Sequence, residues 1–119
     1  MTYQEIFDIV KIHLLTQNAK AYLFDAASQY AYKTDAGLKD SIGALISDAL
    51  YTPEIETKPV SDPQVLGLLK DSGVITDIQM VDRSVVLFLT QLQQIHDHHP
   101  VEQWEFVLRE FANVMNLTF

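Results

Sequence analysis

Three of the four histidines in the chain lie in one short segment, QQIHDHHPVEQW, which spans residues 93–104. Imidazole nitrogens and carboxylate oxygens are common zinc ligands, and two histidines three residues apart can share one ion. His96 and His99 have this spacing, and Asp97 could supply a third ligand. Imidazole is also the commonest general base in enzymes. The segment therefore raises three alternatives: a metal site, an acid–base site, or a turn between two helices.

Pro100 favours the turn. The residue before a proline avoids the helical conformation, so the preceding helix has to end before Pro100. His96 then continues the apolar face of this helix, His99 already lies in the turn, and Asp97 points elsewhere. A protonated histidine at the C-terminus of a helix is favoured by the helix dipole by ~0.3–1 kcal/mol. We therefore expect a structural corner, with His96, Asp97 and His99 as the only metal candidates, and no metal bound there.

Other patterns that carry known chemistry do not occur. The chain has no cysteine, which excludes disulfides, thiolate metal sites and a cysteine nucleophile. Its four glycines are scattered, so no glycine-rich phosphate loop is present. The sequence SIGAL lacks the glycine spacing of a serine nucleophile elbow. We predict that the protein is not an enzyme and needs no cofactor.

The charge of the chain bears on its partners. Sixteen acidic residues oppose eight lysines and arginines, which gives a net charge of −8. Nucleic acids and anionic membranes attract clustered positive charge, and no basic cluster occurs. We expect no direct binding to nucleic acid and none to membranes, whereas a basic protein partner would suit the acidic surface. The absence of cysteine, of a signal-peptide pattern and of an apolar run of ~18 residues predicts a cytoplasmic protein, in a bacterium or a phage-infected host.

Helices are predicted over most of the chain, which at 119 residues suits a single domain spanning 1–119. Thr2 and Glu5 form a capping-box pattern before a helix that ends near 17–18. The most apolar helix is expected at the centre of the core because its apolar residues cover a wide face. Asp62 and Pro63 mark another helix start. The expected helices cover about 2–18, 41–50, 63–72, 82–97 and 100–115.

The segment 21–41 has a different period. Tyr30 and Tyr32 alternate with alanine, which is typical of a strand, and TDAG at 34–37 has the composition of a turn. We predict an antiparallel hairpin of two strands, or three if residues 22–24 pair with it. Gly43 is expected to permit a close approach between this hairpin and the next helix. The predicted fold class is α+β, with about five helices around the central helix 82–97 and a small hairpin near 21–41.

Three stretches of the chain resemble a group of small bacterial, phage and prophage proteins of unknown function: QEIFDIVKIHLLTQNAK, YKTDAGLKDSIGALISDALYTPEIE and LQQIHDHHPVEQWEFVLREFA. The group shares a Lys-x-x-x-Gly-x-Leu-Ile-x-Asp-x-x-Tyr block and an Ile-His-Asp helix end. Lys39, Gly43, Asp48 and Tyr51 fit the block, and Asp40 stands where the group often has cysteine. The resemblance implies a shared fold and a bacterial or phage origin, and it brings no activity with it.

Three classes of function remain open. The first is a non-enzymatic, acidic protein-binding module, which in a phage or prophage could inhibit a host defence protein. Its chain is rich in tyrosines, which suit interfaces. The second is a structural or regulatory homodimer, which would cover surplus apolar surface. The third is binding of a metal or small ligand at His96–His99. The candidate partner-binding residues are Tyr22, Tyr30, Tyr32, Tyr51, Glu54 and Glu56.

Overall fold

The computed structural model describes residues 1–23 and 29–119 of the chain. The regular structure of these residues is helical. An α-helix satisfies its own backbone hydrogen bonds, and packing of its apolar face supplies most of its stability. Within the described ranges, no helix is long and apolar enough to cross a membrane. The α-helices are α1 (Tyr3–Gln17), α2 (Pro63–Asp71), α3 (Arg83–His98) and α4 (Trp104–Val114), and single 3₁₀ turns cover Gly43–Leu45, Pro53–Ile55, Gln79–Val81 and Val101–Gln103.

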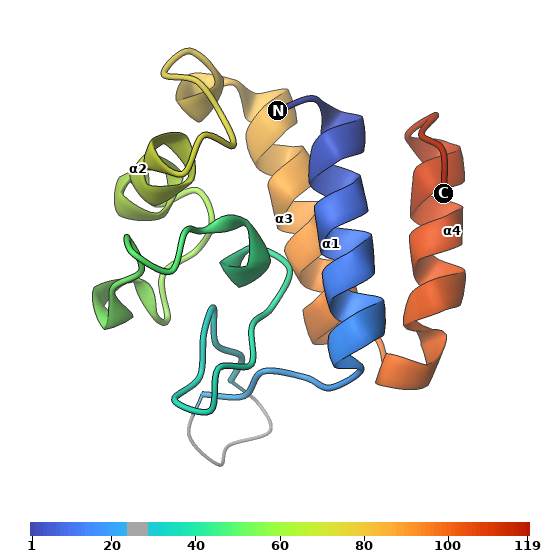
Figure 1. The fold of residues 1–119 in the computed structure, drawn as a ribbon. Helices are drawn as coiled ribbons and strands as arrows, with labels where there is room; N and C mark the ends of the chain where they lie inside the picture. The colour runs from blue at the N-terminus through green and yellow to red at the C-terminus, as the bar shows by residue number, and fades with distance from the viewer. Residues whose placement is uncertain (24–28) are drawn as a thin grey trace.

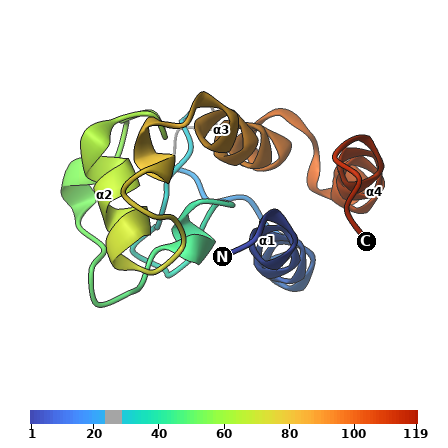
Figure 2. The ribbon, with the colours of Figure 1, turned by 90° about the horizontal axis from the view of Figure 1, so that it is seen from above.

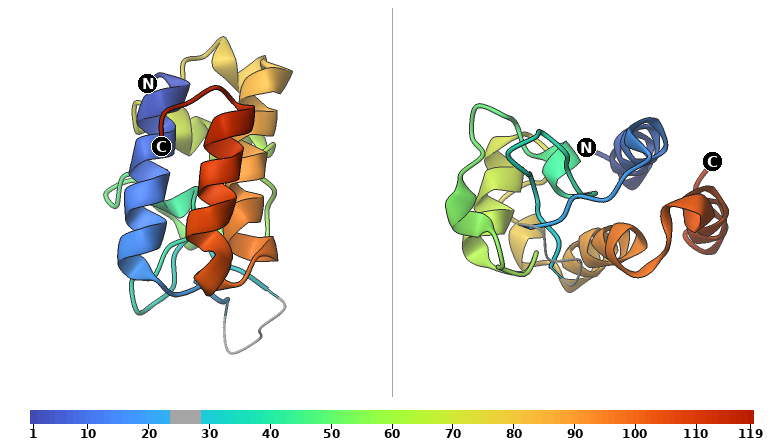
Figure 3. Two further views of the ribbon diagram at one scale, coloured as in Figure 1. Left: turned by 90° about the vertical axis from the view of Figure 1, so that its right-hand side faces the viewer. Right: turned by 90° about the horizontal axis from the view of Figure 1, so that it is seen from below.

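The helices form a layered arrangement. α1 and α3 lie side by side and run in the same direction, and α4 runs back in the opposite direction (Figure 1). Seen from above, α4 covers one side of the α1–α3 pair (Figure 2). The other side is covered by α2 and by the described residues between α1 and α2, 18–23 and 29–62, which we call the irregular segment. The chain after α4 folds back toward α1 (Figure 3), where the Gln4 amide oxygen accepts a 2.9 Å hydrogen bond from the Thr118 N–H. The α1–α3 pair is therefore covered on both sides.

Local signals in the sequence set the helix ends. Thr2 and Glu5 form the predicted capping box, and Asn18 ends α1 in the left-handed conformation with φ 50°. The Asp62 side chain accepts the Gln64 N–H, and Pro63 opens α2. These predictions are confirmed because each depends on residues within one turn of the helix end.

One face of α3 forms part of the hydrophobic core. Apolar side chains recur along one face of this helix and are buried. The Tyr3 ring of α1 stacks on the Phe88 ring with a centroid separation of 4.1 Å. Trp104 of α4 is also fully buried. Burial of a large apolar side chain contributes ~1.5–3 kcal/mol, so this face holds the three layers together. The buried apolar residues of α3 are Val85, Phe88, Leu89, Leu92 and Ile95.

The predicted α+β fold class is wrong, because the described residues form no sheet. In the described part of the predicted hairpin, residues 21–23 and 29–41, the structure has two isolated bridges, Tyr22 with Tyr30 and Lys33 with Lys39. The reason lies in the backbone partners of this segment. The N–H groups of Tyr32 and Lys33 donate to the Glu56 carboxylate at 2.9 and 3.2 Å, where a strand would need a neighbouring strand. Residues 24–28, part of the predicted hairpin, lie outside the described residues.

The helix predicted at 41–50 is also wrong, and only one 3₁₀ turn, Gly43–Leu45, forms there. Its apolar residues Ile42 and Leu45 are nevertheless buried, so the pattern indicated burial and not a continued helix. A close approach does occur at Gly43, although it joins two segments that form neither the predicted hairpin nor the predicted helix. A Cβ atom on Gly43 would lie 1.8 Å from the carbonyl oxygen of Tyr32. Only glycine can therefore occupy this position without a shift of the backbone.

Candidate functional site

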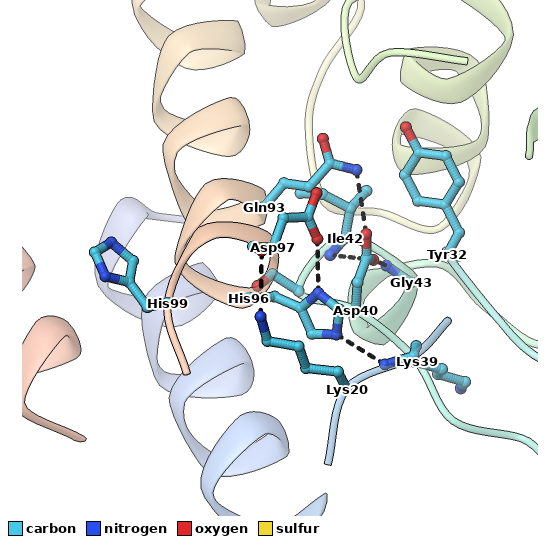
Figure 4. Close-up of polar contacts among 12 residues, drawn as sticks. Lys20, Tyr32, Lys39, Asp40, Ile42, Gly43, Gln93, His96, Asp97 and His99 are labelled. Atoms are coloured by element: carbon cyan, nitrogen blue, oxygen red, sulfur yellow. Dashed lines mark hydrogen bonds and ion pairs between the residues drawn. The ribbon is translucent and has the colours of Figure 1, made fainter. Parts of the chain in front are cut away.

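The histidine-rich segment is a corner between α3 and α4. α3 ends at His98, and His99 is extended with φ −125° and ψ 141°. The Trp104 indole N–H donates to the backbone carbonyl of His99 at 3.1 Å, which fixes the turn into α4. The His99 side chain points away from His96 (Figure 4). The predicted turn between the two helices, with α3 ending before Pro100, is confirmed.

His96 is fully buried and uses both ring nitrogens within the fold. Its Nε2 accepts a 3.0 Å hydrogen bond from the Ala21 N–H. A nitrogen that accepts carries no proton, so the neutral ring has its proton on Nδ1. Nδ1 then donates to the Asp97 carboxylate, whose Oδ1 lies 2.7 Å away. Asp97 therefore faces His96, and the prediction that it points elsewhere is wrong.

A histidine oriented by a carboxylate resembles the base of many active sites. Here the second nitrogen is already occupied by the Ala21 amide, and the ring has no exposed surface. Tyr30 meets the ring edge-on at a centroid distance of 5.6 Å, and Trp104 packs on it at 5.4 Å. Within the described residues, no group of three or more His, Asp or Glu side chains could hold a metal ion. The arrangement connects α3 to the segment that follows α1.

Asp40 forms a second buried polar centre beside His96. Its Oδ1 accepts the N–H groups of Ile42 and Gly43 at 3.0 and 2.7 Å, and its Oδ2 accepts the Gln93 amide at 3.1 Å. Burial raises the pKa of Asp40 to about 6, although these hydrogen bonds favour the charged form. Asp40 therefore caps the 3₁₀ turn that brings Gly43 against Tyr32.

The residue before Asp40 is held by α1. Gln17 accepts the Lys39 N–H at 3.0 Å and donates to the Lys39 carbonyl at 2.8 Å. His13 donates to the same carbonyl through Nε2 at 2.9 Å, and burial lowers the pKa of His13. The Lys39 ammonium pairs with Asp48 at 2.7 Å. Lys39 and Asp48, which fit the Lys-x-x-x-Gly-x-Leu-Ile-x-Asp-x-x-Tyr block, therefore have contacts that hold the fold together.

The predicted tyrosines divide between the surface and the core. Tyr22 and Tyr30 stack with their ring centroids 5.5 Å apart, and Tyr22 is 39% exposed. Tyr32 is only 3% exposed, and its hydroxyl donates to the Lys58 carbonyl at 2.6 Å. Burial raises the pKa of the Tyr32 hydroxyl. Tyr32 therefore belongs to the core and is not presented to a partner in this fold.

Glu56 and Tyr51 contact each other at the edge of the irregular segment. The Tyr51 hydroxyl donates to Glu56 Oε2 at 2.5 Å. Burial raises the pKa of Tyr51, and so do this hydrogen bond and the charge of Glu56. The Glu56 carboxylate also binds backbone N–H groups, so its first role is structural. Glu54 is exposed and accepts the Gln64 amide at 3.1 Å.

Two adjacent hollows lie beside the exposed Tyr22 and the half-buried Tyr30 and Tyr51, and Tyr22 lines both. We name the first the corner hollow, about 550 Å³, and the second the loop hollow, about 590 Å³. We call the residues that line these two hollows the tyrosine face. The corner hollow is lined by Lys20, Tyr22, Tyr30, Asp97, His98, His99, Pro100, Val101 and Glu102. The loop hollow is lined by Tyr22, Leu23, Lys33, Thr34, Asp35, Ala36, Tyr51, Pro53, Glu56 and Thr57.

Sequence reasoning missed several residues of this region. Asp40 precedes the SIG tripeptide, and an aspartate before a helical turn is a capping signal that could have identified it. Lys20 had no sequence signal. Its ammonium donates to the Asp97 carbonyl at 3.2 Å and lies 5.1 Å from the centre of the Tyr30 ring. The Ala21 amide, a backbone group, could not be recognised from residue types.

No protein-family model, no curated protein and no solved structure matches the chain. The resemblance to the bacterial and phage group therefore stays a prediction from the residues. A function is therefore inferred from the geometry of the tyrosine face and the charge of the chain.

Proposed function

We propose that the protein is a binding module that recognises a basic partner protein through the tyrosine face. The observation that carries this proposal is the place of Tyr22. This exposed ring stacks on Tyr30 and lines both hollows, one of which also contains Tyr51. Segments on either side of the first 3₁₀ turn therefore contribute large aromatic side chains to one surface.

Aromatic side chains on such a surface favour protein binding. Tyrosine is enriched in interfaces because it buries a large area with few rotatable bonds and keeps a polar tip. Each hollow lies within the range of ~300–1,000 Å³ that is usual for binding pockets. The two hollows share Tyr22, so an extended segment of a partner could insert one side chain into each hollow.

The charge of the protein supports a basic partner. The net charge is −8, and the rims of the hollows contain Asp35, Asp97 and Glu102. Complementary charge speeds association and makes it sensitive to salt. We therefore expect binding to weaken when the salt concentration rises from about 0.1 M to about 0.5 M. We also infer action in the cytoplasm, because the chain has no cysteine for the disulfides that small secreted domains commonly use.

Affinity capture tests this proposal. Tagged wild-type protein is used to capture partners from the cells that express it naturally, alongside Tyr22→Ala and a matched control, Ile78→Ala. Ile78 is 80% exposed and precedes α3, at the end of that helix opposite the corner. A specific partner should be retained by the wild type and the control, and reduced at least about tenfold by Tyr22→Ala.

Equal capture by all three proteins would contradict the use of the tyrosine face. A partner that prefers high salt would contradict the basic character that we propose for it.

A second candidate, homodimer formation, has one observation in its favour. A groove of about 290 Å³ between α3 and α4 is lined by Ile95, Val107 and Phe111, among others. Phe106, also on α4, is 68% exposed. Contiguous apolar surface of sufficient area often marks a contact between proteins. Light scattering at micromolar concentration would detect a dimer, and a monomer at every concentration would contradict this candidate.

A further inference from the structure

We infer that His96 is a pH-sensitive switch: a proton that binds its Nε2 breaks the hydrogen bond from the Ala21 N–H and detaches Ala21 and Tyr22 from α3. This inference concerns the fold and does not depend on the proposed function. It follows from which atom of a buried histidine accepts a hydrogen bond and from the charges that surround the ring.

The switch consists of one lone pair. Nε2 of His96 uses it to accept the Ala21 N–H at 3.0 Å, and the ring is fully buried. A protonated imidazole has a donor on each nitrogen, so after proton binding the Nε2–H and the Ala21 N–H point at each other. Nδ1 keeps its contact with Asp97, whose Oδ1 lies 2.7 Å away (Figure 4). The ring is therefore held in place, and Ala21 is the partner that has to move.

Two carboxylates attract a proton to this ring. Asp97 contacts Nδ1 directly, and Asp40 is 1% exposed in the irregular segment. Burial raises the pKa of Asp40 to about 6, and attraction to the charge of His96 opposes this rise. The attraction is mutual, so the Asp40 carboxylate also favours the protonated form of His96. Acid therefore has a reason to add a proton at this buried position.

The α1 helix contributes one titratable group, His13. Burial and the charges of Lys39 and His96 lower the pKa of His13, although its hydrogen bond to the Lys39 carbonyl acts in the opposite direction. His13 therefore gives up its own proton more readily when His96 becomes charged, and its neutral form does not oppose the switch.

The remaining neighbours add one positive charge. The Lys20 ammonium donates to the Asp97 carbonyl at 3.2 Å and opposes a proton on the nearby ring. Tyr30 and Trp104 present uncharged rings to the imidazole, at centroid distances of 5.6 and 5.4 Å. Two carboxylates thus act against one ammonium, and the balance favours a protonated His96 as the pH falls.

Ala21 connects the end of α3 to one side of the corner hollow. Its carbonyl accepts the Ala31 N–H at 2.9 Å, and Tyr22 pairs with Tyr30 in an isolated bridge. The bond to His96 ties this pair of short segments to α3. When the bond breaks, Tyr22 and Tyr30 can move away from residues 97–102, which line the opposite side of the corner hollow. Acid should therefore loosen this part of the tyrosine face.

A pH titration of the full chain, labelled with ¹⁵N, tests the inference by nuclear magnetic resonance. The imidazole nitrogen signals report the proton on Nε2 of His96, and hydrogen exchange reports the Ala21 amide. The Leu92 amide, inside α3, is the reference for exchange. Between about pH 8 and about pH 5, Nε2 should gain a proton, and the exchange rate of Ala21 relative to Leu92 should rise at least about tenfold. A ring that stays unprotonated throughout, or a protonated ring with an unchanged exchange ratio, would overturn the inference.

Replacement of one carboxylate tests the source of the attraction. Asp40→Asn removes a buried charge beside His96 and should move the midpoint of Nε2 protonation to lower pH by about half a unit or more. Asp77→Asn removes a carboxylate elsewhere, whose side chain is 80% exposed, and should leave the midpoint unchanged. Equal midpoints in the two variants would refute the attraction on which the switch depends.

A third variant, His96→Gln, separates the ring from the contact. A glutamine amide oxygen can accept the Ala21 N–H and takes up no proton in this range. The exchange ratio of Ala21 should therefore be the same at about pH 8 and at about pH 5 in this variant. A rise that persists without the imidazole would place the effect of acid elsewhere, and the inference would be wrong.

Discussion

His96 accepts a hydrogen bond from the backbone amide of Ala21, a residue that lies 75 positions earlier in the chain. The contact joins the end of α3 to the start of the irregular segment, next to Tyr22. Because the same ring donates to Asp97, one buried side chain fixes the corner and one edge of the tyrosine face. The stability of the fold and the shape of the proposed binding face therefore depend on this ring.

Replacement of this ring by a phenyl group tests its role. His96→Phe keeps most of the volume but removes both nitrogens, so the Ala21 N–H and the Asp97 carboxylate lose their partner. A buried group without a hydrogen bond costs ~1–3 kcal/mol, and more if it is charged. We expect the free energy of unfolding to fall by ~2–4 kcal/mol in urea titrations followed by circular dichroism.

The control for this prediction is His98→Ala. His98 is exposed, and its removal should change the free energy of unfolding by less than ~0.5 kcal/mol. If His96→Phe lowers the free energy of unfolding by as little as His98→Ala, the nitrogens of His96 contribute nothing to stability.

Asp40 gives the folded protein a specific pH dependence. Burial raises the pKa of Asp40 from 3.8 to about 6, so the folded state binds this proton more tightly than the unfolded state. The contribution of this carboxyl to stability therefore falls as the pH rises from about 4 to about 6, by ~2–3 kcal/mol. Asp40→Asn should remove this loss, because an amide oxygen can still accept the Ile42 and Gly43 N–H groups.

Urea titrations of both proteins at several pH values check this prediction. The asparagine variant should be more stable than the wild type near pH 7, and the difference should shrink toward pH 4. Its amide would donate to Gln93 after a flip of the Gln93 amide group. Parallel stability curves for the two proteins would contradict a raised pKa at Asp40.

Gly43 and Gly67 form a matched pair for a test of backbone packing. A Cβ atom at Gly43 would meet the Tyr32 carbonyl oxygen at 1.8 Å, whereas one at Gly67, inside α2, would meet nothing within 4 Å. Gly43→Ala should destabilise the protein by ~3 kcal/mol or more, since two backbone segments must separate. Gly67→Ala should stabilise it by ~0.5–1 kcal/mol through helix propensity. Calorimetric melting temperatures that shift in the same direction for both variants would refute this comparison.

Much of the helical framework could be predicted because its signals are local. The cap at Thr2, the left-handed Asn18 and the proline after the corner act within one turn of the chain, so residue types suffice to place them. The burial of His96 also followed from helical spacing. The partner of its Nε2, the Ala21 N–H, could not be predicted. Every residue except proline has a backbone N–H, so the residue type does not indicate which one is bound.

The prediction that the tyrosines lie at a binding surface fits the structure only in part. Tyr22, Tyr30 and Tyr51 line the hollows, whereas Tyr32 is buried. Residue type alone cannot separate them, since a tyrosine suits a core whenever its hydroxyl finds an acceptor. The Lys58 carbonyl provides that acceptor for Tyr32.

The sequence by itself determined where α1, α2, α3 and the corner lie. Helix ends depend on residues within one turn of the chain, and an apolar face depends on residues three or four positions apart. Only the tertiary structure decided the path of the chain between α1 and α2. The alternating residues near Tyr30 would suit a strand, but a strand needs a partner with free backbone groups. Here the His96 ring and the Glu56 carboxylate accept the N–H groups of Ala21, Tyr32 and Lys33, and the described residues of the segment line two hollows without forming a sheet.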